Sequence, residues 1–155
     1  MKEVIYIGSD HAGFKLKEQL KLWLVKENIS YEDKGNWLYD KDDDYPDYAA
    51  KVARAVVKDK TLGILLCGSA EGMCVAANKI KGVRAVNPAN ETLTKLSREH
   101  NDANIICLSG GGTLQPIKGM SLMKAKKMIT IFLKTNFSKA KRHLRRVNKI
   151  KRLDK

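Results

Sequence analysis

The feature that most constrains the fold is an alternation, along the whole chain, between short apolar runs and longer segments with apolar residues at helical spacing. Residues 62–67 form the clearest run, apolar almost throughout, as in strands buried on both faces of a parallel sheet. Alternating strand and helix patterns indicate βαβ units, with parallel strands side by side and helices on both faces. We therefore predict an α/β, three-layer fold with a five-stranded parallel sheet and a C-terminal helix.

The hydrophobic periodicity also places the individual elements. The expected strands are residues 4–7, 28–32, 62–67, 83–86 and 105–108. The expected helices are residues 12–27, 48–57, 73–77, 91–100, 120–134 and 139–153. Residues 35–44 are polar and indicate a surface loop. Because no repeat or long linker divides the chain, we expect one domain over residues 1–155, in which 138–155 is a basic C-terminal helix.

Several classes of protein are excluded by what the sequence lacks. No apolar run approaches the roughly 18 residues of a membrane-spanning helix, so no membrane partner is expected. The first residues lack the apolar core and cleavage site of a signal peptide. The three cysteines are an odd number without metal-type spacing, which argues against a disulfide framework and an all-cysteine zinc site. We expect a cytoplasmic protein.

The net charge of +13 has an uneven distribution. Residues 1–117 hold 16 basic and 16 acidic side chains, whereas residues 118–155 hold 14 basic side chains and a single acid, Asp154. A neutral body with a basic C-terminal segment suggests a local anionic partner, such as a phosphate group, RNA or an acidic protein surface. The alternative interpretation is an ordinary solvated helix face.

Reactive side chains follow the first and third predicted strands. Ligands of parallel sheets bind beyond the C-terminal ends of the strands, where Asp10, His11 and Cys67 are expected. Cys67 precedes a turn into a helix, and outward-pointing amides and the helix dipole there are expected to lower the pKa of its thiol. Cys67 is therefore a candidate base or nucleophile, or alternatively a small core residue. Cys74 and Cys107 lie in apolar runs and are expected in the core.

Other polar clusters have both a chemical and a structural interpretation. The amides of residues 68–72 can surround an anion, although glycine turns are common at such junctions and this one is neither a Walker A loop nor a dinucleotide fingerprint. His11 and His100 lie near carboxylates and are candidate proton shuttles, or capping and surface groups. Arg142 and Arg146 lie four residues apart on one helix face, where both can reach one phosphate.

Several of these stretches, taken together and in this order, resemble the ribose-5-phosphate isomerase type B family, which also includes allose- and galactose-6-phosphate isomerases. The similarity covers nearly the whole chain. The matching stretches are residues 8–14, 44–49, 66–69, 72–73, 76–79, 82–85, 98–104, 142–143 and 146–147.

The resemblance implies an aldose–ketose isomerase that interconverts ribose 5-phosphate and ribulose 5-phosphate through an enediolate, with no metal and no organic cofactor. It also implies an α/β Rossmann-like subunit that forms a homodimer or homotetramer with active sites shared between subunits. One alternative is an isomerase of a six-carbon 6-phosphate sugar, allose or galactose 6-phosphate. Another is a catalytically weakened homologue that binds RNA or a protein partner; for an isomerase, no nucleic-acid partner is expected.

The resemblance also assigns roles to individual residues. Cys67 matches the catalytic cysteine that moves a proton between C2 and C1, His100 the ring-opening histidine, and Asp10 a residue that handles sugar hydroxyls. The backbone amides of Gly68, Ser69, Ala70, Glu71 and Gly72 are implied to form the anion hole. The other implied substrate-binding residues are His11, Tyr45, Asn101, Lys118, Arg142 and Arg146.

Three departures from the family pattern affect the expected site. Ala70 and Glu71 follow Ser69 where the family usually has a second glycine; a positive φ would strain Ala70, and Glu71 would repel an anion. Residues 109–116 resemble an insertion, after which Lys118 falls where the family has an arginine, without the bidentate guanidinium. Residues 87–90 differ from the family near the sugar, which leaves the substrate open.

Overall fold

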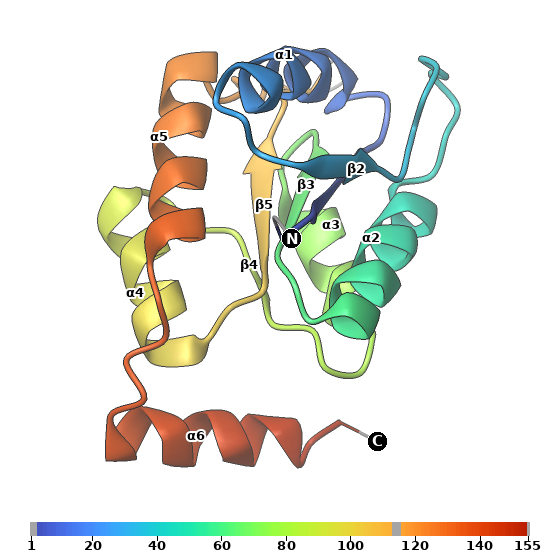
Figure 1. Cartoon of the computed structure of the whole chain (residues 1–155). Coiled ribbons are helices and arrows are strands. Elements are labelled where there is room, and N and C mark those ends of the chain that lie inside the picture. The colour runs from blue at the N-terminus through green and yellow to red at the C-terminus, as the bar shows by residue number, and fades with distance from the viewer. Residues whose placement is uncertain (1–2, 113–115, 155) are drawn as a thin grey trace.

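The computed structural model describes residues 3–112 and 116–154, and strands and helices alternate along the chain as predicted (Figure 1). All strand pairs are parallel, in the order β2-β1-β3-β5-β4, which confirms the predicted five-stranded parallel sheet. The strands are β1 (Ile5–Ser9), β2 (Tyr31–Asp33), β3 (Gly63–Cys67), β4 (Ala85–Val86) and β5 (Ile105–Ser109). The helices are α1 (Phe14–Lys26), α2 (Tyr45–Asp59), α3 (Glu71–Ala77), α4 (Glu91–Asn101), α5 (Leu122–Lys134) and α6 (Lys141–Lys151).

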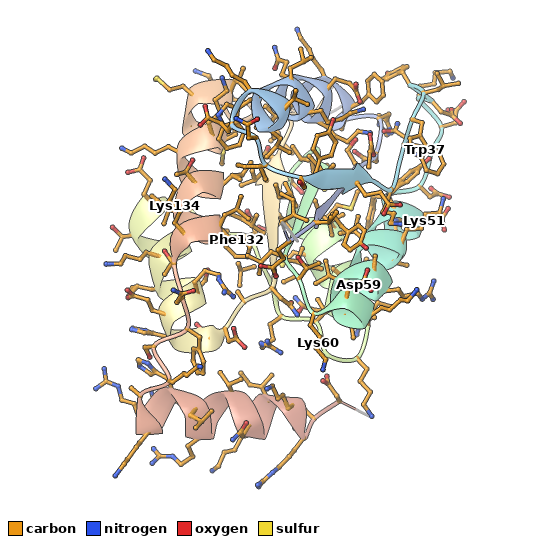
Figure 2. All side chains as sticks on the ribbon, in the orientation of Figure 1. Trp37, Lys51, Asp59, Lys60, Phe132 and Lys134 are labelled. Atoms are coloured by element: carbon orange, nitrogen blue, oxygen red, sulfur yellow. The ribbon has the colours of Figure 1, made fainter. Side chains whose placement is uncertain are left out.

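Alternate residues of the central strands face two separate helical layers. Ile64 and Leu66 of β3 pack in a core with α1 and α5, and Figure 2 places Phe132 of α5 on that side of the sheet. Leu65 and Cys67 pack in a second core with α2 and α3. Full burial of a large aliphatic side chain contributes about 1.5–3 kcal/mol, so both faces of the sheet drive folding. This explains why β3 is apolar throughout.

Local capping groups explain the small differences from the predicted boundaries. α2 begins at Tyr45 because Pro46 lies in its first turn, where no intrahelical N–H donor is needed. α5 begins after Ser121, whose hydroxyl accepts a hydrogen bond from the Lys124 amide. β2 starts only at Tyr31 because the chain first turns at Asn28, which has a φ of 56°.

α6 lies beyond the N-terminal edge of the sheet, at the end of the molecule opposite the tip of β5 (Figure 1). It contacts α4, and it buries only two side chains, His143 and Val147. The residue after its C-terminal turn, Asp154, accepts a hydrogen bond from the Gly82 amide. Most of the basic side chains of α6 therefore face solvent.

Among the described residues, one cation is completely buried. Lys17 of α1 has no exposed surface, and its Nζ donates to both carboxylate oxygens of Asp33 at 3.0 and 2.8 Å and to the backbone oxygen of Asn36. Lys21, less buried, also contacts Asp33 at 2.9 Å. A buried charge is tolerated only with such partners, so Lys17 ties the chain after β2 to α1.

Within residues 3–112 and 116–154, no helix combines the length and the apolar character that crossing a bilayer requires.

Candidate active site

The topology places a crevice between β1 and β3. The connection from β1 leads outward to β2 on one side, whereas β3 lies on the other side of β1, so the chain diverges at this point. In open parallel sheets, ligands bind where the strand order diverges, at the carboxyl ends of the strands. A cavity of about 390 Å³ lies there. Its lining residues are Asp10, His11, Ala12, Tyr45, Cys67, Gly68, Ser69, Gly72, Gly112 and Ile117.

Cys67 is the last residue of β3 and is 4% exposed at the cavity wall. Burial raises the pKa of its thiol, and the negative charge of Asp10 acts in the same direction. The backbone amides of Met73, Ala70 and Ser69 are hydrogen-bonded to the sulfur and lower the pKa, but they do not outweigh burial. The expected lowering of the Cys67 pKa is therefore wrong for the unliganded site, because that expectation counted the amides and not the desolvation.

The loop between β3 and α3 has a positive φ at Ala70, the conformation that the sequence analysis identified as strained for an alanine. Ala70 has a φ of 72°, in the left-handed region that favours glycine, and its side chain is fully buried. Such a backbone costs an alanine about 1–2 kcal/mol. With Ala70 in this conformation, the amides of Ser69, Ala70 and Met73 converge on the Cys67 sulfur.

Glu71 does not point into the cavity. Its Oε1 accepts a hydrogen bond of 2.7 Å from Nδ2 of Asn87, which follows β4. The cavity lining includes neither Glu71 nor Ala70 among the described residues, so both contribute to this loop through the backbone. The expected repulsion of an anion by Glu71 is reduced, because its carboxylate is directed toward Asn87.

Asp10 follows β1 and is 5% exposed. Its Oδ1 accepts a hydrogen bond of 3.1 Å from the Gly13 amide at the start of α1. Burial raises the pKa of the carboxyl, while the Gly13 amide and the charge of His11 oppose that shift. The other face of Gly13 packs on the backbone of Leu66, where a Cβ atom would come within 2.5 Å of a carbonyl oxygen. This contact fixes the loop that carries Asp10.

His11 is paired with Asp43, a residue that the sequence analysis missed. Nδ1 of His11 lies 2.7 Å from Oδ1 of Asp43, and the same oxygen accepts the His11 backbone N–H at 2.9 Å. The hydrogen bond to Asp43 is the main cause of a raised His11 pKa; burial acts against it. Asp43 lies in the predicted surface loop, and nothing in the sequence distinguishes it from the exposed Asp42 and Asp44.

Tyr45 lines the cavity from the first turn of α2 and packs on α3. A Cβ atom at residue 72 would lie 2.7 Å from Tyr45 Cζ, so this close approach requires Gly72. Tyr45 is 41% exposed, which leaves its ring accessible from the solvent side. The tyrosine expected at the site from the resemblance is thus present at the cavity.

The glycine-rich segment after β5 closes one side of the cavity. Gly110 N–H donates to the Cys67 oxygen at 2.8 Å, and Gly111 N–H donates to the Gly68 oxygen at 3.1 Å. Gly112 and Ile117, which the sequence analysis also missed, line the cavity. Residues 113–115 of the apparent insertion lie outside the described residues. Lys118 is exposed, next to Ile117, and does not line the cavity.

The remaining predicted site residues lie at the opposite edge of the sheet. His100 and Asn101 end α4, just before β5 begins, and Arg142 and Arg146 lie on α6. Figure 1 shows the C-terminal end of α4 and the helix α6 near the N-terminal edge of the sheet, away from the carboxyl ends of the strands, where Cys67 lies. Within one chain, the structure therefore gathers Asp10, His11, Tyr45 and Cys67 but not these four residues.

The residues at the N-terminal edge form a cluster of their own, which we call the α4–α6 cluster: His100, Asn101, Arg142, His143 and Arg146. The rings of His100 and His143 lie 4.1 Å apart between centroids, and Arg142 Nε donates to His143 Nε2 at 3.0 Å. The pKa of His143 is lowered by desolvation and by the positive charges around it. An imidazole that accepts at Nε2 is neutral, so His143 joins the two helices without adding charge.

Among the described residues, one group has donor atoms close enough to share a metal ion: Asp10, His11 and Asp43, within 4.8 Å of one another. The His11 and Asp43 atoms already bond to each other. This hydrogen bond accounts for the short distance between the His11 and Asp43 atoms.

A sulfur beside converging amides and a buried carboxylate can move protons next to a carbonyl group, and comparison with known proteins identifies the class. Residues 5–150 match the Ribose/Galactose Isomerase family, and the chain belongs to this family. A relative from Mycoplasma genitalium, named "Probable ribose-5-phosphate isomerase B", is 41% identical over 153 residues, covering 97% of this chain and 95% of the relative.

Solved structures agree with this assignment. Ribose-5-phosphate isomerase B from Mycoplasma genitalium with bound ribulose-5-phosphate superposes with a TM-score of 0.89 and 39% identity, covering 99% of this chain and 97% of that chain. The ribose 5-phosphate isomerase of Thermotoga maritima gives a TM-score of 0.87 and 38% identity, covering 98% and 99%. The family predicted from the sequence motifs is confirmed.

Proposed function

We propose that this protein is a ribose-5-phosphate isomerase, which interconverts ribose 5-phosphate and ribulose 5-phosphate. The observation that carries the proposal is Cys67 at the wall of the cavity, with three backbone amides on its sulfur and Asp10 beside it. Membership of the Ribose/Galactose Isomerase family supports the same reaction. An aldose–ketose isomerisation has no net oxidation, so the reaction needs a proton carrier and no electron carrier.

The proposed chemistry is a proton transfer between neighbouring carbons. With the sugar ring opened, the Cys67 thiolate takes the proton from C2, and the C–H electron pair forms the C1=C2 double bond. The aldehyde oxygen becomes the enediolate oxygen, which the amides of the loop at residues 68–72 stabilise. Cys67 then returns its proton to C1 while the O2 hydroxyl proton moves to O1, which leaves a ketone at C2. In this proposal, Asp10 binds the sugar hydroxyls.

We further propose that two copies of the chain build each site. The cavity holds a base and an amide-lined loop, whereas the α4–α6 cluster holds a histidine and exposed arginines suited to ring opening and phosphate binding. These sets lie at opposite edges of one subunit, so a homodimer in which the cluster of one copy meets the cavity of the other would complete the site. The tetramer and the cytoplasmic location stay predictions.

The direct test is a turnover assay with several sugar phosphates. We expect ketose formation from ribose 5-phosphate, and slower turnover of allose 6-phosphate and galactose 6-phosphate at equal concentration. Faster turnover of a six-carbon sugar would change the substrate and keep the mechanism. No turnover with any sugar phosphate would contradict the proposal and favour a binding protein. An RNA-binding role of the basic segment would then appear as affinity that falls steeply with salt.

Replacing Arg142 with alanine is expected to raise KM for ribose 5-phosphate by about 10- to 100-fold, with kcat changed by less than about threefold. A charge-assisted hydrogen bond to phosphate contributes about 1.5–3 kcal/mol, and the phosphate lies far from the reacting carbons. Steady-state kinetics measures both constants. Arg145→Ala removes an equal charge from the same helix and serves as the control. Equal KM values for wild type and Arg142→Ala would remove this arginine from the site.

A further inference from the structure

Asp43 is a buried acid within an exposed acidic loop. Its side chain is 4% exposed, whereas that of the neighbouring Asp42 is 76% exposed. One carboxylate oxygen, Oδ1, accepts two hydrogen bonds from His11: the backbone N–H at 2.9 Å and Nδ1 at 2.7 Å. Two bonds to one residue fix both the backbone and the ring of His11. Asp43 thus has the contacts of a side chain that orients another.

The other carboxylate oxygen anchors Asp43 to the interior. Asn36 Nδ2 donates to Oδ2 of Asp43 at 3.0 Å, and Asn36 is 2% exposed. The Asn36 side-chain oxygen accepts from the Ser9 hydroxyl at 3.1 Å, and its backbone oxygen accepts from the buried Lys17. A chain of hydrogen bonds therefore runs from α1 and the end of β1 to Asp43. The carboxylate is held by the core of the subunit, although its neighbours in the loop face solvent.

This arrangement determines which nitrogen of the His11 ring is available to a ligand in the cavity. With Nδ1 bonded to the carboxylate, Nε2 is the ring nitrogen left for a ligand, and His11 lines the cavity. Three acids face the ring, Asp43, Asp10 and the exposed Asp40, and all of them favour the protonated imidazole. The Tyr39 ring lies nearly perpendicular to the His11 ring, with centroids 6.5 Å apart. A protonated ring of fixed orientation is a suitable donor to a phosphate oxygen.

We propose that Asp43 is a positioning residue that holds His11 in one orientation, with Nδ1 on the carboxylate, so that Nε2–H binds the phosphate of the substrate. The inference rests on the function proposed above. Asp43 itself does not line the cavity, so it acts through His11. Its removal should weaken substrate binding and leave the proton transfer at Cys67 unchanged.

The test compares Asp43→Asn with Asp42→Asn, which removes the same charge from the same loop without a contact to His11. The chain has three histidines, so each ring can be followed by NMR as pH is changed. We expect His11 to titrate at a lower pH in Asp43→Asn than in wild type, and at an unchanged pH in Asp42→Asn. In the wild-type protein, His11 should titrate at a higher pH than His143, a measurement that stands even if Asp43→Asn does not fold.

Kinetics provides the second readout. We expect Asp43→Asn to raise KM for ribose 5-phosphate about tenfold at a pH between the His11 titrations of variant and wild type, with kcat within about threefold, and to match wild type more closely at a pH below both titrations. An unchanged His11 titration, or an unchanged KM at a pH between the two titrations, would overturn the proposal. If the wild-type protein turned over no sugar phosphate, the proposed function would fail separately; the His11 titrations with and without inorganic phosphate would still decide the role of Asp43.

Discussion

Replacing Cys67 with alanine is expected to lower kcat for ribose 5-phosphate by about three orders of magnitude or more, because the variant has no base at C2. The amides of the loop at residues 68–72 and the phosphate-binding residues remain, so KM should change little. Measuring ketose formation in wild type and variant checks this. Cys74→Ala is the matched control, since Cys74 lies on α3 outside the cavity lining. An active Cys67→Ala variant would show that another group moves the proton.

The pH profile provides a second check on the role of Cys67. Burial and the charge of Asp10 raise the pKa of the thiol, so the free enzyme holds mostly thiol near neutral pH. We expect kcat/KM to rise with pH above 7, because this constant follows the ionisation of the free enzyme. Asp10→Asn removes a negative charge and should speed alkylation of Cys67 at pH 7. A kcat/KM that falls between pH 7 and pH 8.5 would contradict the assignment.

Replacing Lys17 with methionine is expected to reduce the free energy of unfolding by about 3 kcal/mol, because it leaves buried acceptors without their cation. Lys17 is fully buried, and Asp33 and the Asn36 oxygen both depend on it. The remaining ion pair of Asp33 with Lys21 keeps the loss at the lower end of the range for a broken buried pair. Urea unfolding at pH 7 measures the difference. Lys21→Met, at a more exposed site, should cost less than about 1 kcal/mol.

The stability difference should also depend on pH in a definite direction. Burial alone would raise the pKa of Asp33, but hydrogen bonds from Lys17, Lys21 and the Gly35 amide outweigh it, so the folded pKa is lowered. A lowered pKa contributes stability above the unfolded value of about 4, and this contribution is lost as pH falls through the folded value. The difference in the free energy of unfolding between wild type and Lys17→Met should therefore decrease below about pH 4. A difference in the free energy of unfolding that does not change with pH would mean that the charge of Asp33 is not responsible for the stabilisation by Lys17.

Much of the fold could be predicted because its signals are local. The apolar run at 62–67 predicted a strand buried on both faces. The alternation of strand and helix patterns before and after it predicted a parallel sheet. The rule that ligands meet the carboxyl ends of strands then placed Asp10, His11 and Cys67 on one edge, as the structure has them. The family's usual glycine near residue 70 indicated that a positive φ would strain Ala70, and the structure has that φ.

The parts that could not be predicted depend on three-dimensional packing. Asp43 stands out only through its contact with His11, which lies 32 residues earlier in the chain. In the sequence it is one of three successive aspartates, and the other two are exposed. The pKa of Cys67 depends on how deeply the sulfur is buried, which no local pattern reports. The distance between Cys67 and the α4–α6 cluster follows from where α6 packs. The resemblance implied sites shared between subunits, and the single subunit divides the predicted site residues between two edges of the sheet.

Subunit complementation tests the central claim most directly: that the cavity of one copy and the α4–α6 cluster of another form one site. Cys67→Ala is mixed with the double variant His100→Ala and Arg142→Ala, and subunits are exchanged by mild unfolding and refolding. Each mixed dimer would carry one doubly damaged site and one intact site. We predict that random mixing restores about a quarter of wild-type activity, although each parent is inactive or nearly so. Activity no higher than the average of the two parents, in samples shown to contain mixed dimers, would contradict the shared site.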